Sequence, residues 1–213
     1  LHEVERNLEL IGGGPWEAPR MYPGEAERAR AKELLAQLPA APVALAPGSI
    51  WATKRWPAVR WAELLGGMAR AGRPTVLLGG PDDAALCAEI RAAAQLPVGC
   101  APCLDLAGQT SLRESAAVLE RCATLVSNDS APMHLGVAAG IPVVAVYCST
   151  IPAFGFAPRG PRDLVLEVDG LDCRPCGIHG HPECPEGHFR CGVDLDSAQV
   201  LSAALERSSA LAV

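Results

Sequence analysis

The chain has 213 residues, of which 49% are hydrophobic, 20% charged and only 4% aromatic, and its formal net charge is −6. This much apolar sequence can bury one core, which excludes an intrinsically disordered chain and a disulfide-rich miniprotein. The negative charge argues against nucleic acid as a partner, because phosphate backbones attract basic surfaces.

The ends and apolar runs of the sequence predict a soluble, cytoplasmic protein. No run reaches the roughly 20 apolar residues of a membrane-spanning helix. The first residues have neither the basic start nor the apolar stretch of a secretory signal. The chain starts at Leu1 in a polar, amphipathic stretch. We therefore expect a fragment cut from a longer protein.

Residues 1–23 contain glycines and prolines that break regular structure, which predicts an arm or interdomain linker. We place the compact domain at 24–213. Beyond the linker, short apolar runs alternate with helical segments. The predicted strands are 43–46, 75–78, 123–127, 143–147 and 164–168, and the predicted helices are 25–38, 57–71, 81–95, 111–122, 132–139 and 197–209. This order predicts an α/β fold with a doubly wound, Rossmann-like parallel sheet, whose ligands bind beyond the carboxyl ends of the strands.

The first candidate site is the segment PGSIWATKRWP at 47–57, between a predicted strand and a predicted helix. Glycine and serine let backbone N–H groups approach a phosphate, and Lys54 and Arg55 add positive charge before a helix N-terminus. The alternative is a solvated loop that carries two surface cations. The segment is not a Walker loop, because GxxxxGK[ST] is absent.

The second candidate site is Ser127–His134, which also joins a strand to a helix. Ser130 and the backbone after it suit phosphate, and Asp129 suits sugar hydroxyls. The alternative is that either side chain caps the helix, which contributes about 1 kcal/mol. A Ser130 nucleophile with His134 as its base is disfavoured, since no G-x-S-x-G elbow surrounds it. Both loops follow strands of one predicted parallel sheet, so they are predicted to face the same crevice.

The third candidate site is a cysteine-rich loop at 171–193. Cys173-x-x-Cys176 is followed by Cys184 and Cys191, a set that resembles a structural zinc site. The wide spacing of the second pair leaves two alternatives open, namely free thiols in a reducing cytoplasm and two disulfides.

Two further turns lie at the same predicted edge of the sheet. Asp83 follows the predicted strand 75–78 and suits a ribose diol, whereas Asp82 suits a helix cap. The turn at 108–112 opens another helix, and capping explains Ser111 without a ligand.

Five segments of the chain together resemble the C-terminal half of the bacterial heptosyltransferase family, glycosyltransferase family nine. They are PGSIWATKRWP (47–57), LLGGPDD (77–83), DLAGQTSL (105–112), NDSAPMHLGVAAGIPVVAVY (128–147) and CPEGHFRC (184–191). They occur in the family's order and cover about residues 43–205. The resemblance implies the nucleotide-sugar domain of a two-domain GT-B glycosyltransferase. It also implies an ADP-sugar donor such as ADP-heptose, a lipopolysaccharide core acceptor, no catalytic cofactor, and work at the inner face of the membrane.

The resemblance also implies roles for individual residues. By this resemblance, Lys54 contacts the donor diphosphate, with Ser49 and Thr53 nearby, and Asp129, Ser130 and Ala131 line the diphosphate and the sugar. The base is flanked by Thr110, Ser111, Leu112 and Met133, and Asp83 approaches the ribose. His134, in the predicted helix 132–139, is also counted among the donor-binding residues. Ala131 stands where the family commonly has glycine, which narrows the backbone approach.

The family's catalytic carboxylate belongs to its N-terminal domain, to which nothing in this chain corresponds. The chain is therefore predicted to bind donor but to need its own N-terminal domain as a partner for turnover. Two other readings remain open, a non-catalytic nucleotide-binding module and a zinc-stabilised interaction domain.

Overall fold

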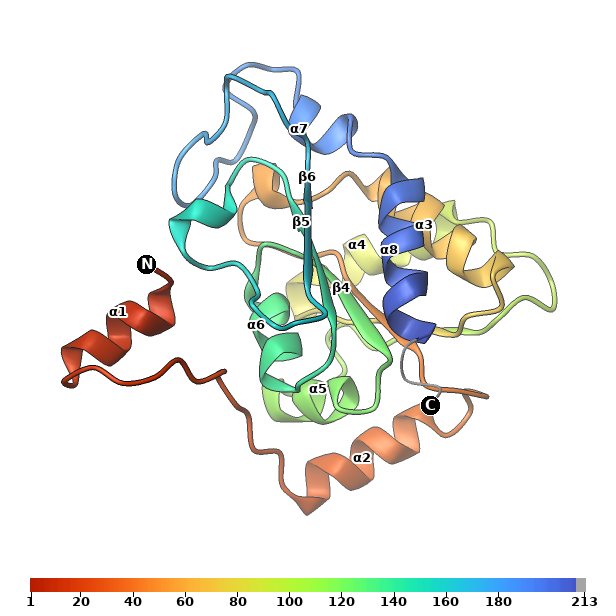
Figure 1. Ribbon diagram of the computed structural model, residues 1–213. Coiled ribbons are helices and arrows are strands. Elements are labelled where there is room, and N and C mark those ends of the chain that lie inside the picture. Colours follow the sequence, from red (N-terminus) through yellow and green to blue (C-terminus); the bar gives the residue numbers. More distant parts are fainter. Residues whose placement is uncertain (210–213) are drawn as a thin grey trace.

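The structure is a computed structural model that describes residues 1–209 (Figure 1). Its strands are β1 (Val43–Ala46), β2 (Thr75–Leu77), β3 (Cys103–Asp105), β4 (Thr124–Asn128), β5 (Val143–Tyr147) and β6 (Leu164–Glu167). Its α-helices are α1 (Glu3–Leu10), α2 (Glu25–Leu35), α3 (Ala58–Arg70), α4 (Ala84–Ala93), α5 (Leu112–Leu119), α6 (Ala131–Ala138), α7 (Arg190–Val193) and α8 (Ser197–Ser209), and its 3₁₀ helices are η1 (Ala52–Lys54), η2 (Pro81–Asp83) and η3 (Pro152–Phe154). None of the helices within residues 1–209 has both the length and the apolar character that crossing a bilayer demands.

The six strands form one parallel sheet in the order β3-β2-β1-β4-β5-β6. The chain builds outward from β1 to β3 and then returns to the other side of β1 with β4. The loops after β1 and β4 therefore lie side by side, at the point where the order reverses and where doubly wound folds bind ligands. The predicted doubly wound, Rossmann-like architecture is confirmed.

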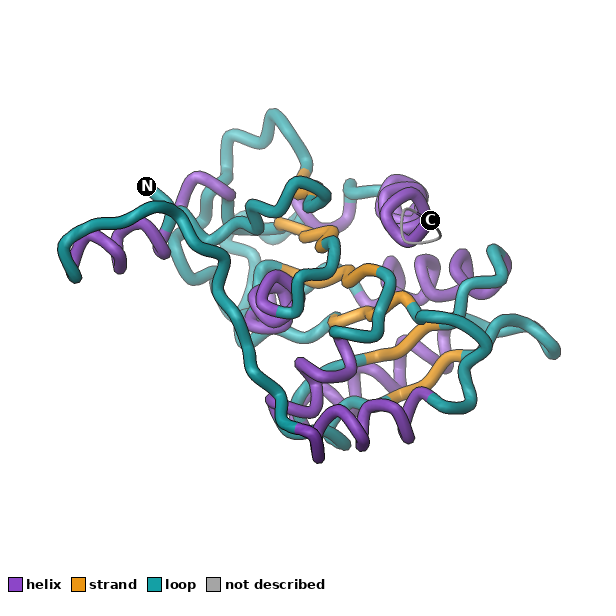
Figure 2. The backbone as a smooth tube through the Cα atoms, turned by 60° about the horizontal axis from the view of Figure 1, so that its bottom comes forward, coloured by secondary structure: helices purple, strands orange, loops and turns teal. Residues whose placement is uncertain are grey.

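Helices cover both faces of the sheet (Figure 2). Leu45 packs with α3, α4 and α8 on one face, while its neighbour Ala44 packs with α2, α5 and α6 on the other. Successive strand residues point to opposite faces. Both faces of the central strands are thus buried, which explains why these strands read as continuous apolar runs rather than alternating ones.

Several elements differ from the sequence expectation, among them α7, η1 and η3, which lie in segments predicted to be loops. β3 was not predicted, because it is a three-residue, half-buried edge strand with too short an apolar pattern. The segment 1–23, predicted as an arm or interdomain linker without regular structure, contains the helix α1. The imidazole Nδ1 of His2 caps this helix by accepting from the Val4 N–H at 3.1 Å, and the Glu3 N–H donates to the Gly155 carbonyl at 2.8 Å. The glycine and proline breaks act only after α1, from Gly12 onward.

Candidate functional site

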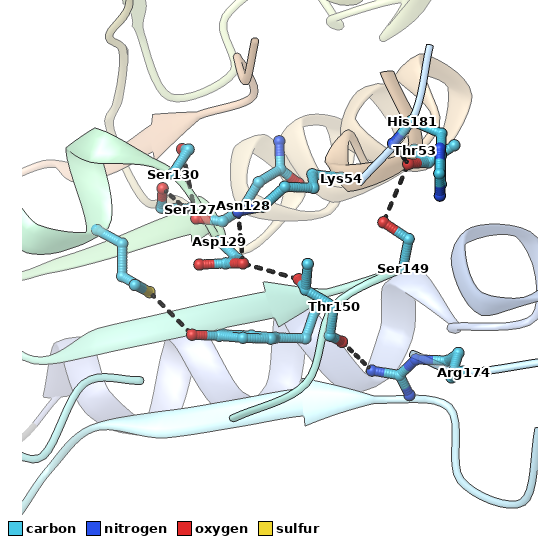
Figure 3. A network of polar contacts seen from close by, with 12 residues as sticks. Thr53, Lys54, Ser127, Asn128, Asp129, Ser130, Ser149, Thr150, Arg174 and His181 are labelled. Carbon is cyan, nitrogen blue, oxygen red and sulfur yellow. Dashed lines mark hydrogen bonds and ion pairs between the residues drawn. The ribbon is translucent and has the colours of Figure 1, made fainter. Parts of the chain in front are cut away.

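The site centres on Lys54 and Asp129, which meet at the carboxyl edge of the sheet. β1 and β4 are direct neighbours, with Ala46 opposite Ser127, so the loops that follow them converge. The Lys54 ammonium lies 2.6 Å from Asp129 Oδ2, and the side chains are 14% and 9% exposed (Figure 3). The two loops that the sequence predicted to face one crevice therefore meet at the same edge of the sheet.

Asn128 holds the Lys54 loop in place from the end of β4. Its amide Oδ1 accepts from the Trp56 N–H at 3.0 Å, and its Nδ2 donates to the Pro47 carbonyl at 2.7 Å. Trp56 is buried against Trp61 in an edge-to-face contact, with ring centroids 5.4 Å apart. One buried amide therefore fixes both ends of the loop that carries Lys54.

Asp129 is oriented by Thr150, which follows the carboxyl end of β5, and lies near Tyr147, the last residue of that strand. The Thr150 hydroxyl donates to Asp129 Oδ2 at 2.7 Å. Burial raises the pKa of the Tyr147 hydroxyl, and the nearby Asp129 carboxylate raises it further, so this phenol stays neutral. The carboxylate is directed at Lys54 and Thr150.

The first turn of α6 lacks a side-chain cap. Ser130 is its N-cap residue, but its hydroxyl donates to the Asn128 carbonyl at 3.4 Å and accepts no helix N–H. The capping alternative for Asp129 and Ser130 is thus not what the structure shows. An uncapped helix N-terminus presents partial positive charge, which favours an anion. This positive end lies beside Lys54.

Ser49 and Thr53 belong to the loop that carries Lys54, and Asp83 packs against the beginning of that loop at Gly48. Ser49 is half-buried, and its carbonyl accepts from Arg55 Nε at 2.6 Å. Thr53 is 3% exposed and lies beneath Lys54 rather than on the surface. The Asp83 carboxylate accepts from the Gly80 N–H at 2.9 Å and packs so closely on Gly48 that any side chain there would collide with it.

The remaining residues of the implied donor site differ in their burial and in their hydrogen bonds. Ser111 caps α5, accepting from the Glu114 N–H at 3.3 Å while its own N–H donates to the Glu114 carboxylate at 2.7 Å. Thr110 is half-buried with its hydroxyl 2.8 Å from that of Ser115, and Leu112 and Ala131 are exposed.

Met133 does not face the crevice. Although the resemblance implies a contact with the base, its side chain has no exposed surface and packs in the core beneath α6, with the Tyr147 hydroxyl donating to its sulfur at 3.8 Å. His134, one residue on, is exposed. Partial desolvation lowers the pKa of its imidazole, an effect that the Asp129 carboxylate opposes.

The cysteine-rich loop, residues 171–193, does not assemble a metal site. Cys191 lies in α7 and is buried in the core, while the Cys184 sulfur accepts from the Phe189 N–H at 3.4 Å and the Cys176 thiol faces the Cys173 carbonyl at 3.3 Å. Within residues 1–209, no three Cys, His, Asp or Glu side chains come together closely enough to hold a metal ion. The four thiols are free in this structure and form no disulfide.

Several residues of the site escaped the sequence reasoning. Asn128, Ser149, Thr150, His181 and Arg174 all belong to the network in Figure 3. Asn128 lies within the second motif, which gave it no role, and Thr150 follows the end of β5, so their positions at strand ends were a usable signal. His181 and Arg174 come from the cysteine-rich loop, and no local pattern connects them to Lys54.

The sheet and the ion pair at its carboxyl edge define a doubly wound α/β domain with a candidate site at the reversal of strand order. The chain belongs to glycosyltransferase family 9, the heptosyltransferases, whose family model matches residues 1–185. The resemblance drawn from the sequence motifs is therefore confirmed.

Individual relatives agree with this assignment. Lipopolysaccharide heptosyltransferase 2 of Escherichia coli K12 is 31% identical over 148 residues, which covers 70% of this chain and 41% of that protein. A family 9 glycosyltransferase from Veillonella parvula superimposes with a TM-score of 0.79 at 27% identity, covering 95% of this chain and 58% of the other. The E. coli heptosyltransferase WaaC with ADP shares the fold, with a TM-score of 0.63, 24% identity and coverage of 97% and 57%. The chain spans between 29% and 41% of the length of the curated relatives that it matches.

Proposed function

We propose that this chain is the donor-binding domain of a heptosyltransferase that takes ADP-heptose and glycosylates a lipopolysaccharide core. Two relatives support this reading: one is named a lipopolysaccharide heptosyltransferase, and a neighbour of the same fold was solved with ADP. The observation that carries the proposal is the Lys54–Asp129 pair at the uncapped start of α6.

The diphosphate of the donor binds where Lys54 meets the α6 N-terminus. Each charge-assisted hydrogen bond from the ammonium or from backbone N–H groups contributes about 1.5–3 kcal/mol. Asp129 holds the ammonium in place before the donor arrives. Once the diphosphate engages Lys54, the Asp129 carboxylate accepts from hydroxyl groups of the sugar, and Asp83 accepts from the ribose.

In the transfer step, negative charge develops on the departing diphosphate as the acceptor hydroxyl attacks the anomeric carbon. Lys54 and the α6 dipole stabilise that charge, because they are fixed before the reaction begins. The carboxylate base that takes the acceptor proton comes from outside these 213 residues. Two observations support a base from elsewhere. Asp129 is already bonded to Lys54 and Thr150, and the chain spans less than half of the length of its curated relatives. The chain alone therefore binds donor without turning it over.

Calorimetric titration of the chain with ADP tests the proposal. We expect measurable binding that Lys54→Ala weakens at least tenfold, which corresponds to about 1.4 kcal/mol or more. The matched control is Lys32→Ala, which removes the exposed lysine of α2 and hence the same charge. Equal ADP affinity for Lys54→Ala and the unaltered chain would remove Lys54 from the site.

A further inference from the structure

The cysteine-rich loop lies over the loop that carries Lys54 and is bonded to it. The Thr53 N–H donates to the His181 carbonyl at 3.1 Å, and the His181 N–H donates to the Thr53 hydroxyl oxygen at 2.7 Å. This reciprocal pair joins residues 128 positions apart in the sequence, one of them adjacent to Lys54. The turn at Gly180 and His181 is therefore attached next to the ammonium-bearing side chain (Figure 3).

The same turn is anchored from two further sides. The Ser149 hydroxyl donates to Thr53 Oγ1 at 3.0 Å, and the Ser149 carbonyl accepts from the Cys176 N–H at 3.0 Å. The His181 ring donates through Nε2 to the Cys176 carbonyl at 2.5 Å. The turn is thus connected both to the Lys54 loop and to the segment after β5.

Arg174 anchors the first residues of the cysteine-rich loop to the end of the sheet. Its guanidinium, 6% exposed, pairs with the Glu167 carboxylate at 2.7 Å and donates to the Thr150 carbonyl at 2.6 Å. Thr150 is also the residue that donates to Asp129. The cysteine-rich loop therefore hydrogen-bonds to Thr53, which adjoins Lys54, and to Thr150, which donates to Asp129.

Gly180 packs directly on the Lys54 side chain. Its φ is +84°, and a Cβ at this position would lie 3.0 Å from Lys54 Cγ, 3.0 Å from Thr53 Oγ1 and 3.2 Å from Trp51 Cβ. Such distances are shorter than ordinary van der Waals contacts, so only glycine lets the turn approach this closely. The backbone of Gly180 therefore packs against the stem of the Lys54 side chain.

We propose that the Gly180–His181 turn is a positioning element of the donor site, which holds the Lys54 stem so that its ammonium faces the diphosphate. This inference rests on the proposed donor-binding function, but its structural part, control of the Lys54 side chain, is measurable without any nucleotide. The chemistry served is recognition of a pyrophosphate by a fixed cation. The cysteine-rich loop is on this account part of the donor site.

Gly180→Ala tests the turn, with Gly170→Ala as the matched control. Gly170 also has a left-handed φ, +71°, and immediately precedes the loop, but a Cβ there meets nothing within 4 Å. Both substitutions place alanine at a left-handed φ, and only Gly180→Ala presses on Lys54. We expect Gly180→Ala to weaken ADP binding at least fivefold and Gly170→Ala to change it less than twofold.

A double-mutant cycle shows whether the effect passes through Lys54. In the Lys54→Ala background, the side chain that Gly180→Ala would displace is gone, so the second substitution should change ADP affinity less than twofold. An undiminished effect in that background, or equal effects of the two glycine substitutions, would overturn the proposal.

A readout without nucleotide separates this inference from the proposed function. The chain has two lysines, Lys32 and Lys54, so ¹³C-lysine labelling gives two side-chain signals that Lys54→Ala assigns. Gly180→Ala should shift the Lys54 signal, whereas Gly170→Ala should leave it in place. An unmoved Lys54 signal refutes the positioning role. A shifted signal in a chain that binds no ADP refutes only the donor-binding function.

If Gly180→Ala lowers the yield of folded chain, Thr53→Val provides a second test. It keeps the side-chain shape but removes the oxygen that accepts from His181 and Ser149. We expect the Lys54 signal to shift in this variant too. An unchanged signal would mean that the bonded turn does not position Lys54.

Discussion

Replacing Lys54 by methionine should destabilise the fold, because it leaves the Asp129 carboxylate without its cation. Methionine keeps the apolar stem that packs against Gly180 and removes only the charge. Deleting one partner of a buried ion pair costs about 3–5 kcal/mol. The Lys54 and Asp129 side chains are 14% and 9% exposed, which places them close to that case.

The expected magnitude is smaller than for an isolated pair. The Thr150 hydroxyl still donates to Asp129 at 2.7 Å in the variant. A hydrogen bond to a charged group retains about 1.5–3 kcal/mol. We therefore expect Lys54→Met to lower the free energy of unfolding by about 1.5–2 kcal/mol, the remainder of the cost of breaking a buried pair. For a chain of this size that corresponds to a midpoint lower by roughly 3–8 °C.

Urea denaturation followed by circular dichroism measures this loss, with Lys32→Met as the control. The double variant Lys54→Met/Asp129→Asn removes both charges, and we expect it to recover most of the stability lost in Lys54→Met. Such non-additivity is the signature of a direct interaction. The reasoning is refuted if Lys54→Met unfolds at the same urea concentration as Lys32→Met, or if the double variant is less stable than Lys54→Met.

Two further predictions concern the scaffold around the site. Asn128→Ala leaves the buried Trp56 N–H and Pro47 carbonyl without hydrogen-bond partners, and each unpaired group costs about 1–3 kcal/mol of stability. The variant should therefore unfold at a lower urea concentration than the control Asn7→Ala, which alters an exposed side chain. Similar unfolding midpoints for the two variants would contradict this. His2 is neutral when its Nδ1 accepts from Val4 and its Nε2 donates to the Ala157 carbonyl at 3.0 Å. Burial lowers the pKa of His2 below its usual 6.5, reinforced by Arg159 and opposed by the Ala157 hydrogen bond, Glu5 and Glu3. The unfolded chain then binds more protons, so this contribution to stability is present above pH 6.5 and is lost as the pH falls through the lowered pKa. The stability difference between the unaltered chain and His2→Gln should accordingly shrink from about pH 7.5 to about pH 5.5, and a difference that stays constant over that range would show that His2 does not titrate in this way.

Local sequence patterns determined most of the fold. The apolar runs at β1, β4 and β5 were predicted within one residue of their observed ends, because strands covered on both faces carry an uninterrupted apolar signal. Capping by Ser111 was likewise readable, since the box is contained in four successive residues. The meeting of Lys54 and Asp129 followed from topology alone, because loops after neighbouring parallel strands must converge.

Only the tertiary structure decided which partners hold those two residues. Thr150 reaches Asp129 across 21 positions and His181 reaches Thr53 across 128, and contacts at such separations leave no periodic trace in the sequence. The same limit applies to Met133, which a motif places at the donor but the packing of α6 places in the core. It applies again to the cysteine-rich loop, whose contacts with the Lys54 loop no local pattern indicates. The spacing of residues fixes only how far apart they lie along the chain. The burial of Cys191 and the hydrogen bond of the loop to Thr53 depend on how distant segments pack together in the folded domain.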